Sequence, residues 1–386
     1  MRAATGSNRR LDLAWRLLGS AGARLAPELR RRQARRQPDW SRRAQLKVLL
    51  VTERDPISES QIFPLYYHAD ALHRRWRTDF REVDFSACEA DPAKVPRGAD
   101  LILAQAWPNK AGQRIAATLE RLREANPDAR VTFMDAGAPL DLRLAEAVAP
   151  WVDRYVKKHV FRERQRYFRH TRGDTNLIEY FNRLYGLGEA PPVEFPIPAG
   201  FLDKLLVGPS FFTSPRMLPV FRSAPEPLSL DKRIHLHARF AEKGEAWYER
   251  MRRHALEACR DFAPGSVISA DSLAFRRYLA ELMAARICFS PFGYGEVCWR
   301  DYEAVMCGAL LVKPDMSHVE TRPNIFVPFE TYVPVAWDLS DLPDKINHYL
   351  HNEEARRAIA RQAYRRLHDY CAQGVFIDQF AGVFDG

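Results

Sequence analysis

The sequence predicts an α/β protein built from two Rossmann-like parallel-sheet domains that face a central cleft. Three observations predict this fold. Short apolar runs alternate with helical segments in both halves of the chain, which is the pattern of parallel strands joined by crossover helices. Two stretches rich in proline and glycine, 190–198 and 208–227, separate the halves. The length of 386 residues is enough for two ordinary domains with sizeable cores.

Residues 1–45 are expected to form a basic extension before the first domain. The chain carries a net charge of +9, and residues 1–43 hold 12 arginines, no lysine and only three acidic residues. Arginine-flanked helical stretches at 11–18 and 25–36 are typical of segments that lie on an anionic membrane surface or bind another acidic partner. A disordered arginine-rich extension is the alternative. Without a long apolar run, the extension is not expected to be a cleaved secretory signal.

Composition narrows the class of protein further. No apolar run approaches the roughly 18–20 residues that cross a bilayer, so we expect no transmembrane helix. The six cysteines show no Cys-x-x-Cys spacing, and several lie in predicted core elements. Reduced thiols in a cytoplasmic protein are therefore expected.

The first domain is expected at 46–200. Its alternating elements are strands at 47–52, 79–85, 100–106 and 130–134 and helices at 63–75 and 111–124. Three carboxylates follow two of these strands, and we predict that one of them takes the proton from an acceptor hydroxyl: Glu53, Asp55 or Asp135. Glu59 and His68 come close behind. Loop carboxylates also cap helices and close turns, so a structural role is the alternative for each.

Between the domains we expect a linker at 201–230. Before it, residues 152–187 form a basic stretch with many aromatic residues. This stretch could bind an acidic acceptor or nucleic acid, but a helix with its arginines in solvent is the simpler interpretation.

The second domain is expected at 231–366, followed by a carboxyl-terminal segment at 367–386. Its most informative part is 287–314, which reads as strand, glycine loop, helix at about 297–306, Cys307-Gly308 at the helix end, and a second strand. Two more strands are expected at 232–240 and 266–270. His235 and His237 alternate on the first of them, but no third metal ligand follows at a recognisable spacing.

Three charged residues near the glycine loop can share one helix face: Glu296, Arg300 and Glu303. A glycine turn before a helix suits a diphosphate, an arginine adds a phosphate clamp, and a carboxylate can accept hydrogen bonds from sugar hydroxyls. The predicted donor-binding set also includes Gly293, Tyr294 and Gly295 of the loop and Arg239 and Lys243 after the first strand. A row of surface ion pairs is the alternative.

At these residues the chain resembles the carboxyl-terminal domain of nucleotide-sugar glycosyltransferases with the GT-B architecture, including the group 1 and exostosin-like families. The resemblance rests on Arg300-Asp-Tyr-Glu303-Ala-Val-Met-Cys-Gly308 and the apolar strand after it, and it covers about the last 155 residues. It implies that Glu303 binds the donor ribose. Many group 1 enzymes have seven residues between two glutamates, whereas six separate Glu296 from Glu303 here, which leaves the role of Glu296 open.

The resemblance implies an enzyme that moves a sugar from a nucleotide donor to a glycan or lipid-linked acceptor, as in polysaccharide biosynthesis. We expect no metal, because an Asp-x-Asp motif is absent, and no cofactor. The expected location is the cytoplasm, peripherally at the inner face of the membrane. No nucleic-acid partner is expected.

Three alternatives stay open at this stage. A nucleic-acid-binding protein would fit the arginine tail, although no known nucleic-acid module supports it. A dinucleotide-dependent oxidoreductase would fit Gly293-Tyr-Gly295, but Cys298 stands where the third glycine belongs. A sugar-nucleotide binder without catalysis fits the second domain.

Overall fold

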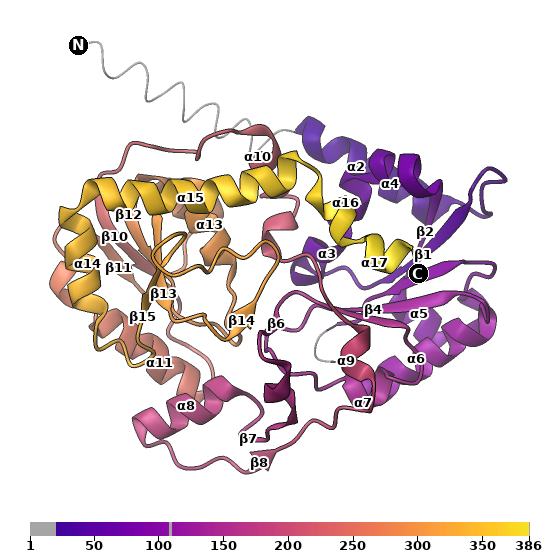
Figure 1. Ribbon diagram of the computed structural model, residues 1–386, viewed down its shortest axis with the longest axis horizontal. Helices are drawn as coiled ribbons and strands as arrows, with labels where there is room; N and C mark the ends of the chain where they lie inside the picture. The colour runs from indigo at the N-terminus through magenta and orange to yellow at the C-terminus, as the bar shows by residue number, and fades with distance from the viewer. Residues whose placement is uncertain (1–20, 108–109, 386) are drawn as a thin grey trace.

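Two parallel β-sheets organise the chain, one in each domain (Figure 1). The computed structural model describes residues 21–107 and 110–385. This topology confirms the predicted α/β fold with two parallel-sheet domains.

The first sheet has six parallel strands in the order β2-β1-β3-β4-β5-β9. Its strands are β1 (Leu46–Thr52), β2 (Thr78–Asp84), β3 (Leu101–Ala104), β4 (Arg130–Asp135), β5 (Arg154–Lys157) and β9 (Leu205–Val207). The helices around it are α3 (Pro56–Tyr67), α4 (Ala69–Trp76), α5 (Phe85–Ala90), α6 (Gly112–Ala125) and α7 (Ala145–Val148). Since β9 lies within 201–230, which we expected to be a linker, the first domain extends at least to Val207.

The helix predicted at 63–75 is wrong in its bounds, because two helices occupy this region. The first begins seven residues earlier, where Asp55 caps α3 and Pro56 occupies its first turn. His68, with φ −99° and ψ 14°, ends α3 and precedes α4. Many residues of α3 are buried, so it lacks the one-sided apolar pattern that the sequence prediction needs.

The second sheet has five parallel strands in the order β11-β10-β12-β13-β15. Its strands are β10 (Ile234–Arg239), β11 (Val267–Ser269), β12 (Ala285–Phe289), β13 (Leu310–Pro314) and β15 (Val333–Val335). The helices of this domain are α11 (Ala246–Glu257), α12 (Phe275–Ala284), α13 (Trp299–Cys307), α14 (Leu342–His351) and α15 (Glu353–Ala372). The predicted order of strand, loop, helix and strand at 287–314 is therefore confirmed.

An arm inserted between β5 and β9 joins the first domain to the second. It contains β6 (Val160–Phe161), η2 (Arg164–Phe168), β7 (Thr171–Arg172), α8 (Asn176–Tyr185) and β8 (Pro192–Val193). The strand β6 pairs in antiparallel fashion with β14 (Val319–Glu320) of the second domain. In α8, Tyr185 reaches His254 of α11 at 3.0 Å, and Phe181 stacks on Trp247. The helix with its arginines in solvent that we expected for 152–187 is thus wrong for most of this range, because strands and a 3-10 helix precede α8.

Two further segments cross between the domains. The forward crossing after β9 contains η3 (Phe211–Thr213) and α10 (Leu218–Ser223). The chain returns to the first domain through α16 (Val375–Gln379) and α17 (Ala381–Phe384), as Figure 1 shows in yellow. There Arg130 donates to the carbonyl of Phe384 at 2.7 Å. These crossings hold the two sheets on opposite sides of one cleft.

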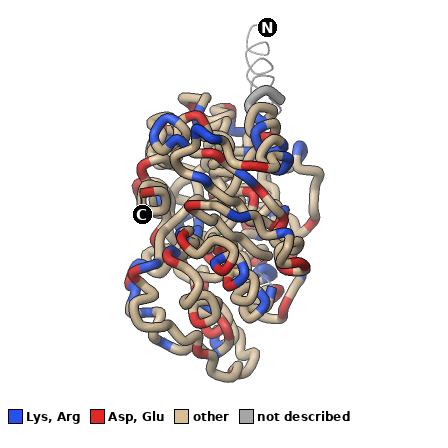
Figure 2. The backbone as a smooth tube through the Cα atoms, turned by 90° about the vertical axis from the view of Figure 1, so that its right-hand side faces the viewer, with Lys and Arg blue, Asp and Glu red and all other residues tan. Residues whose placement is uncertain are grey.

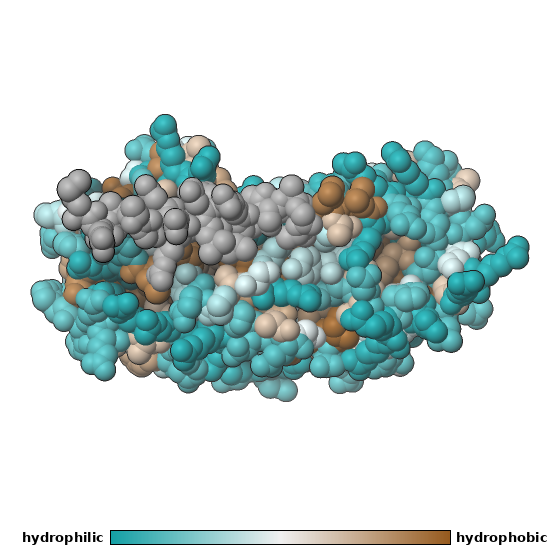
Figure 3. All heavy atoms as spheres, turned by 90° about the horizontal axis from the view of Figure 1, so that it is seen from above, coloured by the Kyte–Doolittle hydropathy of each residue, from teal (hydrophilic) through white to brown (hydrophobic). Residues whose placement is uncertain are grey.

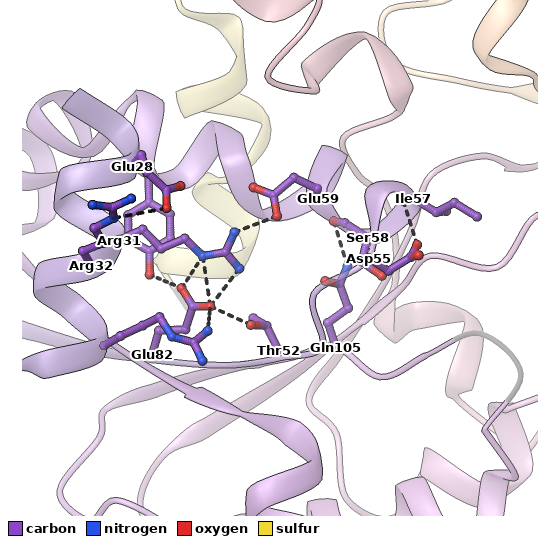
Figure 4. Close-up of polar contacts among 12 residues, drawn as sticks. Glu28, Arg31, Arg32, Thr52, Asp55, Ile57, Ser58, Glu59, Glu82 and Gln105 are labelled. Atoms are coloured by element: carbon purple, nitrogen blue, oxygen red, sulfur yellow. Dashed lines mark hydrogen bonds and ion pairs between the residues drawn. The ribbon is translucent and has the colours of Figure 1, made fainter. Parts of the chain in front are cut away.

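The helix α2 (Ala21–Arg36) packs on the first domain although it lies in the expected basic extension. Arg31, 4% exposed, donates two hydrogen bonds from Nε and Nη2 to the Glu82 carboxylate at 2.8 Å and one from Nη1 to Glu59 at 2.6 Å (Figure 4). Tyr66 and Thr52 donate to the same carboxylate. The buried pair is therefore fully hydrogen-bonded, which is the condition under which such a pair is tolerated. The helical stretch expected at 11–18 lies outside the described residues.

Charge is distributed evenly over the described chain. Figure 2 shows basic and acidic residues interspersed over both domains. Within residues 21–107 and 110–385, no helix is both long enough and apolar enough to cross a membrane.

Candidate donor site in the interdomain cleft

A cavity of about 410 Å³ opens between the two domains. Its walls come from the end of β4, from the start of α11 and from the glycine loop before α13, and they include Asp135, Gly137, Asp141, Lys157, Glu245, Trp247 and Tyr294. Parallel sheets present the carboxyl ends of their strands to such crevices, which is where ligands of α/β proteins bind. The cavity therefore lies where both sets of predicted site residues can meet.

The predicted glycine loop lies directly against the first domain. A Cβ atom on Gly295 would lie 1.9 Å from the carbonyl oxygen of Ala138, so only glycine allows this approach of the two backbones. Gly293 donates from its N–H to the Gly295 carbonyl at 3.0 Å and closes the turn. Tyr294 stacks on Tyr248 of α11 at a centroid distance of 4.3 Å. The loop thus holds the two domains in contact at the mouth of the cavity.

The amino terminus of α13 is capped by its own carboxylate. Asp301 accepts the N–H of Cys298 at 2.8 Å and the hydroxyl of Ser290 at 2.6 Å, and it lies 3.1 Å from the ammonium of Lys313. This cap occupies the N–H of Cys298, and the expectation that the helix end offers N–H groups to a diphosphate stays a prediction. Side chains near this helix end are a further source of positive charge for an anion.

Two arginines with buried guanidinium nitrogens supply that charge. Arg300 on α13 and Arg252 on α11 place their guanidinium groups 5.3 and 5.2 Å from the ring centroid of Phe240. Nε and Nη1 of Arg300 and Nε of Arg252 are buried and have no hydrogen-bond partner among the described residues. Burial first, and then the charge of Arg300, lowers the pKa of Arg252 to about 10. Unpaired buried cations are costly, so this pair is suited to receive an anion.

Arg252 is a site residue that sequence reasoning missed. Its neighbour Arg253 is exposed and pairs with Glu242 and Glu249 at 2.8 and 2.5 Å. Nothing local in the run of arginines distinguishes the two. Only the packing of α11 on the second sheet turns Arg252 inward.

Glu303 lies one turn further along α13. Its side chain accepts a hydrogen bond from the hydroxyl of Tyr278 on α12 at 2.8 Å. Burial raises the pKa of Glu303, against the opposing effects of the Tyr278 hydrogen bond and the Arg300 charge. Arg300 and Glu303 are therefore neighbours away from the surface, which argues against a row of surface ion pairs, and their joint role in donor binding stays a prediction.

Glu296 follows the glycine loop and is 1% exposed. Neither of its carboxylate oxygens has a hydrogen-bond partner among the described residues. The Nε2 atom of His318 lies 3.7 Å from Oε1 of Glu296. A buried carboxylate without donors is costly to maintain, so Glu296 is suited to accept hydrogen bonds from a ligand.

Arg239 and Lys243 lie in different surroundings. Arg239 binds the carboxylate of Glu281 through Nε at 2.9 Å and Nη2 at 3.0 Å, and Nη1 binds Ser269. The guanidinium group of Arg239 is thus already hydrogen-bonded to residues of the second domain. Lys243 is exposed in the loop after β10 and has no ion-pair partner within the described chain.

The three predicted bases of the first domain are all engaged. Glu53 accepts from Ser86 at 3.0 Å, from Lys110 at 2.6 Å and from the N–H of Trp107. Asp55 accepts the N–H of Ile57 at 2.7 Å as the cap of α3, which Figure 4 shows.

Asp135 lines the cavity, but its charge is also compensated. It binds Lys157 at 2.6 Å, the hydroxyl of Tyr155 at 2.7 Å and the N–H of Gly137 at 2.6 Å. Burial alone would raise its pKa, but Lys157 and the hydrogen bonds hold the pKa of Asp135 below its ordinary value. Asp135 therefore stays charged, which makes it a weak base.

The histidines on β10 do not form a metal centre in the described chain. Nε2 of His237 lies 3.3 Å from Glu281, and His235 lies against Gly265. Within residues 21–107 and 110–385, no group of three or more His, Cys, Asp or Glu side chains could hold a metal ion.

A comparison with known protein families finds a match that covers the second domain. Residues 229–373 match the family described as glycosyl transferase-like. None of the curated proteins matches the chain. The second domain is therefore similar in sequence to glycosyl transferase-like proteins over residues 229–373, and its parallel sheet agrees with the fold that the sequence predicted.

Solved structures resemble the chain only distantly. A glycosyltransferase from Rickettsia africae has 8% identity and a TM-score of 0.48 over 88% of this chain and 98% of its own. The lipopolysaccharide outer core galactosyltransferase WaaB has 10% identity and a TM-score of 0.44 over 87% of this chain and 99% of its own. TarM has 6% identity and a TM-score of 0.42 over 74% of this chain, which spans 55% of TarM. The fold assignment here rests on the sheets of the protein itself.

Proposed function

We propose that the protein transfers a sugar from a nucleotide-sugar donor to a glycan or lipid-linked acceptor. The observation that carries this proposal is the pair of buried arginines, Arg252 and Arg300, beside a glycosyl transferase-like glycine loop. Two guanidinium groups at one aromatic ring repel each other unless an anion lies between them. A donor diphosphate is the anion that this family of domains would place there.

The charge of these arginines is also what the reaction needs. When the bond between the sugar and the diphosphate breaks, negative charge grows on the departing phosphate oxygen. Arg252 and Arg300 are held in place by Phe240, so they stabilise that charge without reorganisation. Lys243, exposed in the loop after β10, is proposed to add a third cation. The chain's own cations thus support a metal-independent transfer.

The two carboxylates of the loop and helix suit the hydroxyl groups of the donor. We assign the ribose to Glu303, because Tyr278 already orients its carboxylate. We assign a hydroxyl of the transferred sugar to Glu296, since both of its oxygens lack donors. A hydroxyl group satisfies a buried carboxylate without adding charge.

The acceptor hydroxyl is proposed to enter through the cavity between the domains. Of the three predicted bases, Asp135 is the one that lines this cavity. Its lowered pKa suits a permanently charged group that orients the acceptor hydroxyl better than one that removes its proton. Glu53 and Asp55 serve the fold in this account.

We also propose that the protein lies on an anionic membrane surface. On α2, Leu25 is 56% and Leu29 is 51% exposed, and both lie one helical turn apart beside the exposed Arg32 and Arg36. Figure 3 shows an apolar patch on this upper face, next to the grey amino-terminal residues. Apolar side chains flanked by arginines bind bilayers of anionic lipid. A cytoplasmic location fits the six unpaired cysteines.

Vesicle binding tests the membrane proposal. The double variant Leu25→Ser/Leu29→Ser should bind vesicles of phosphatidylglycerol and phosphatidylcholine more weakly than wild type in a flotation assay. The matched control is Leu184→Ser/Leu187→Ser, which changes one exposed leucine in the last turn of α8 and another just after the helix. Equal loss in both variants would contradict a role for α2.

Donor turnover tests the transferase proposal. Purified protein is incubated with UDP-, GDP-, ADP- and CDP-sugars, and release of the nucleoside diphosphate is measured with and without a chelator. We expect one donor class to be turned over, and Glu303→Ala to lose that activity. No binding and no release with any of them would contradict the proposal.

A further inference from the structure

Arg216 is a positively charged residue of the interdomain crossing, and neither the fold nor the proposed donor site described above assigns it a role. It lies between η3 and α10 and is exposed. Its guanidinium group stacks over Phe275, at the start of α12, with 4.4 Å to the ring centroid. It makes no hydrogen bond or ion pair with any residue in the described part of the chain. An arginine fixed by stacking keeps its planar fork of N–H donors free for a ligand.

A chain of contacts connects Arg216 to the proposed ribose site. The ring of Phe275 stacks on Tyr278 at 6.3 Å. The hydroxyl of Tyr278 donates to Glu303 at 2.8 Å. The charge of Arg216 also counts among the influences that lower the pKa of Glu303 against its burial. Arg216 is therefore a near neighbour of Glu303 across two aromatic rings.

The order of these groups matches the order of parts in a nucleoside diphosphate. The buried Arg252 and Arg300 suit the phosphates, and Glu303 suits the ribose hydroxyls. Phe275 and Arg216 follow Glu303, through Tyr278, in the chain of contacts described above. A ligand held by the first two groups would direct its nucleobase toward the last two.

We propose that Arg216 recognises the nucleobase of the donor and selects a base with a carbonyl oxygen on the facing edge, namely uracil or guanine. This inference rests on the proposed function and assigns the nucleotide class of the same site. A guanidinium group carries only donors, so it pairs with a carbonyl or ring-nitrogen acceptor. Cytosine and adenine present an amino donor where uracil and guanine present that carbonyl, and two facing donors exclude each other.

Binding of four nucleoside diphosphates tests the inference. UDP, GDP, CDP and ADP are titrated separately into full-length wild type and into Arg216→Ala by isothermal titration calorimetry. For wild type we expect UDP or GDP to bind about tenfold more tightly than the amino-bearing CDP and ADP, which is typical of one bidentate arginine contact. In Arg216→Ala that preference should disappear. Arg216→Lys should keep the charge and still lose the preference, because lysine lacks the planar fork.

Arg222→Ala is the matched control. Arg222 lies in the same crossing, is exposed, and stacks on Tyr67 at 5.5 Å, away from the proposed donor site. This variant should bind all four nucleotides as wild type does. Circular dichroism and melting curves establish that each variant is folded.

The outcomes separate the inference from the proposed function. If wild type binds one nucleotide and Glu303→Ala loses it while Arg216→Ala keeps both affinity and preference, the inference is overturned and the proposed function stands. A wild-type preference for CDP or ADP would also overturn it. If wild type binds none of the four, the proposed function fails and the inference fails with it.

Discussion

The candidate site residues of the two domains differ in how their charges are satisfied. In the first domain, Asp135 has three hydrogen-bond donors, and Glu53 is likewise surrounded. In the second domain, Arg252, Glu296 and Arg300 are buried with donors or acceptors unpartnered in the described chain. A protein keeps unpaired buried charges at a cost to stability, and functional sites are where that cost is usual. The comparison indicates that the second domain binds the charged part of the ligand.

The largest effect is expected where a compensated charge is broken. Asp135→Ala leaves the ammonium of Lys157 buried without its partner, so the free energy of unfolding should fall by about 3–5 kcal/mol. Denaturant unfolding measures it. Adding Lys157→Met should recover part of the loss. If Asp135→Ala is as stable as wild type, the first domain does not depend on this pair.

The same pair predicts how stability responds to acid. The pKa of Asp135 is lowered by folding, so its contribution is present above the unfolded-state value and is lost as pH falls through the folded-state value. Below about pH 4, wild type should therefore lose stability more steeply than Asp135→Asn. Melting curves between pH 7 and pH 3 test this, and parallel curves would contradict it.

The next largest effect is expected at Arg300, whose buried nitrogens have no hydrogen-bond partner in the described chain. Arg300→Met should reduce transfer by about 10²–10³-fold, because one stabiliser of the leaving diphosphate is removed. Unlike Asp135→Ala, it should not lower the melting temperature, since no partner is left unpaired. Arg253→Met is the matched control on α11, with turnover close to wild type. Normal turnover in folded Arg300→Met would remove Arg300 from the site.

The first domain also contains a buried amine without a hydrogen-bond partner in the described chain, that of Lys158 directly after β5. It is fully buried beside Phe211, and burial lowers the pKa of its ammonium to about 7 from 10.5. The unfolded chain therefore binds more protons between these values, so wild-type stability should rise with pH across that window. Lys158→Met should be more stable by about 1–4 kcal/mol at pH 7, and the gain should shrink toward pH 10. A gain that is independent of pH would contradict this cause.

The smallest effect is expected at Glu53. Its salt bridge with Lys110 is partly exposed, so Glu53→Gln should change stability by about 1 kcal/mol or less. Turnover should stay close to that of wild type. A large loss of turnover in the folded variant would return Glu53 to the role of catalytic base.

Local sequence signals were enough to predict part of the fold and part of the candidate site. The glycine loop, α13 and the strand after it follow one another within 28 residues, and their turn, cap and apolar signals are local. Arg300 and Glu303 could therefore be predicted as one site. The partners of Asp135 and Glu53 could not, because Lys157 and Lys110 lie 22 and 57 positions away in the sequence. The same holds for Arg31, whose burial depends on Glu82 of another element.

The central claim is that Arg252 and Arg300 are kept unpaired for a donor diphosphate. The most direct measurement compares melting temperatures of wild type and Arg252→Met/Arg300→Met with and without saturating UDP, GDP, ADP or CDP. Binding to the native state alone raises the melting temperature. The account predicts that the variant without nucleotide melts at or above the wild-type temperature, and that the shift produced by nucleotide in wild type is lost. A less stable variant that keeps the full nucleotide shift would contradict it.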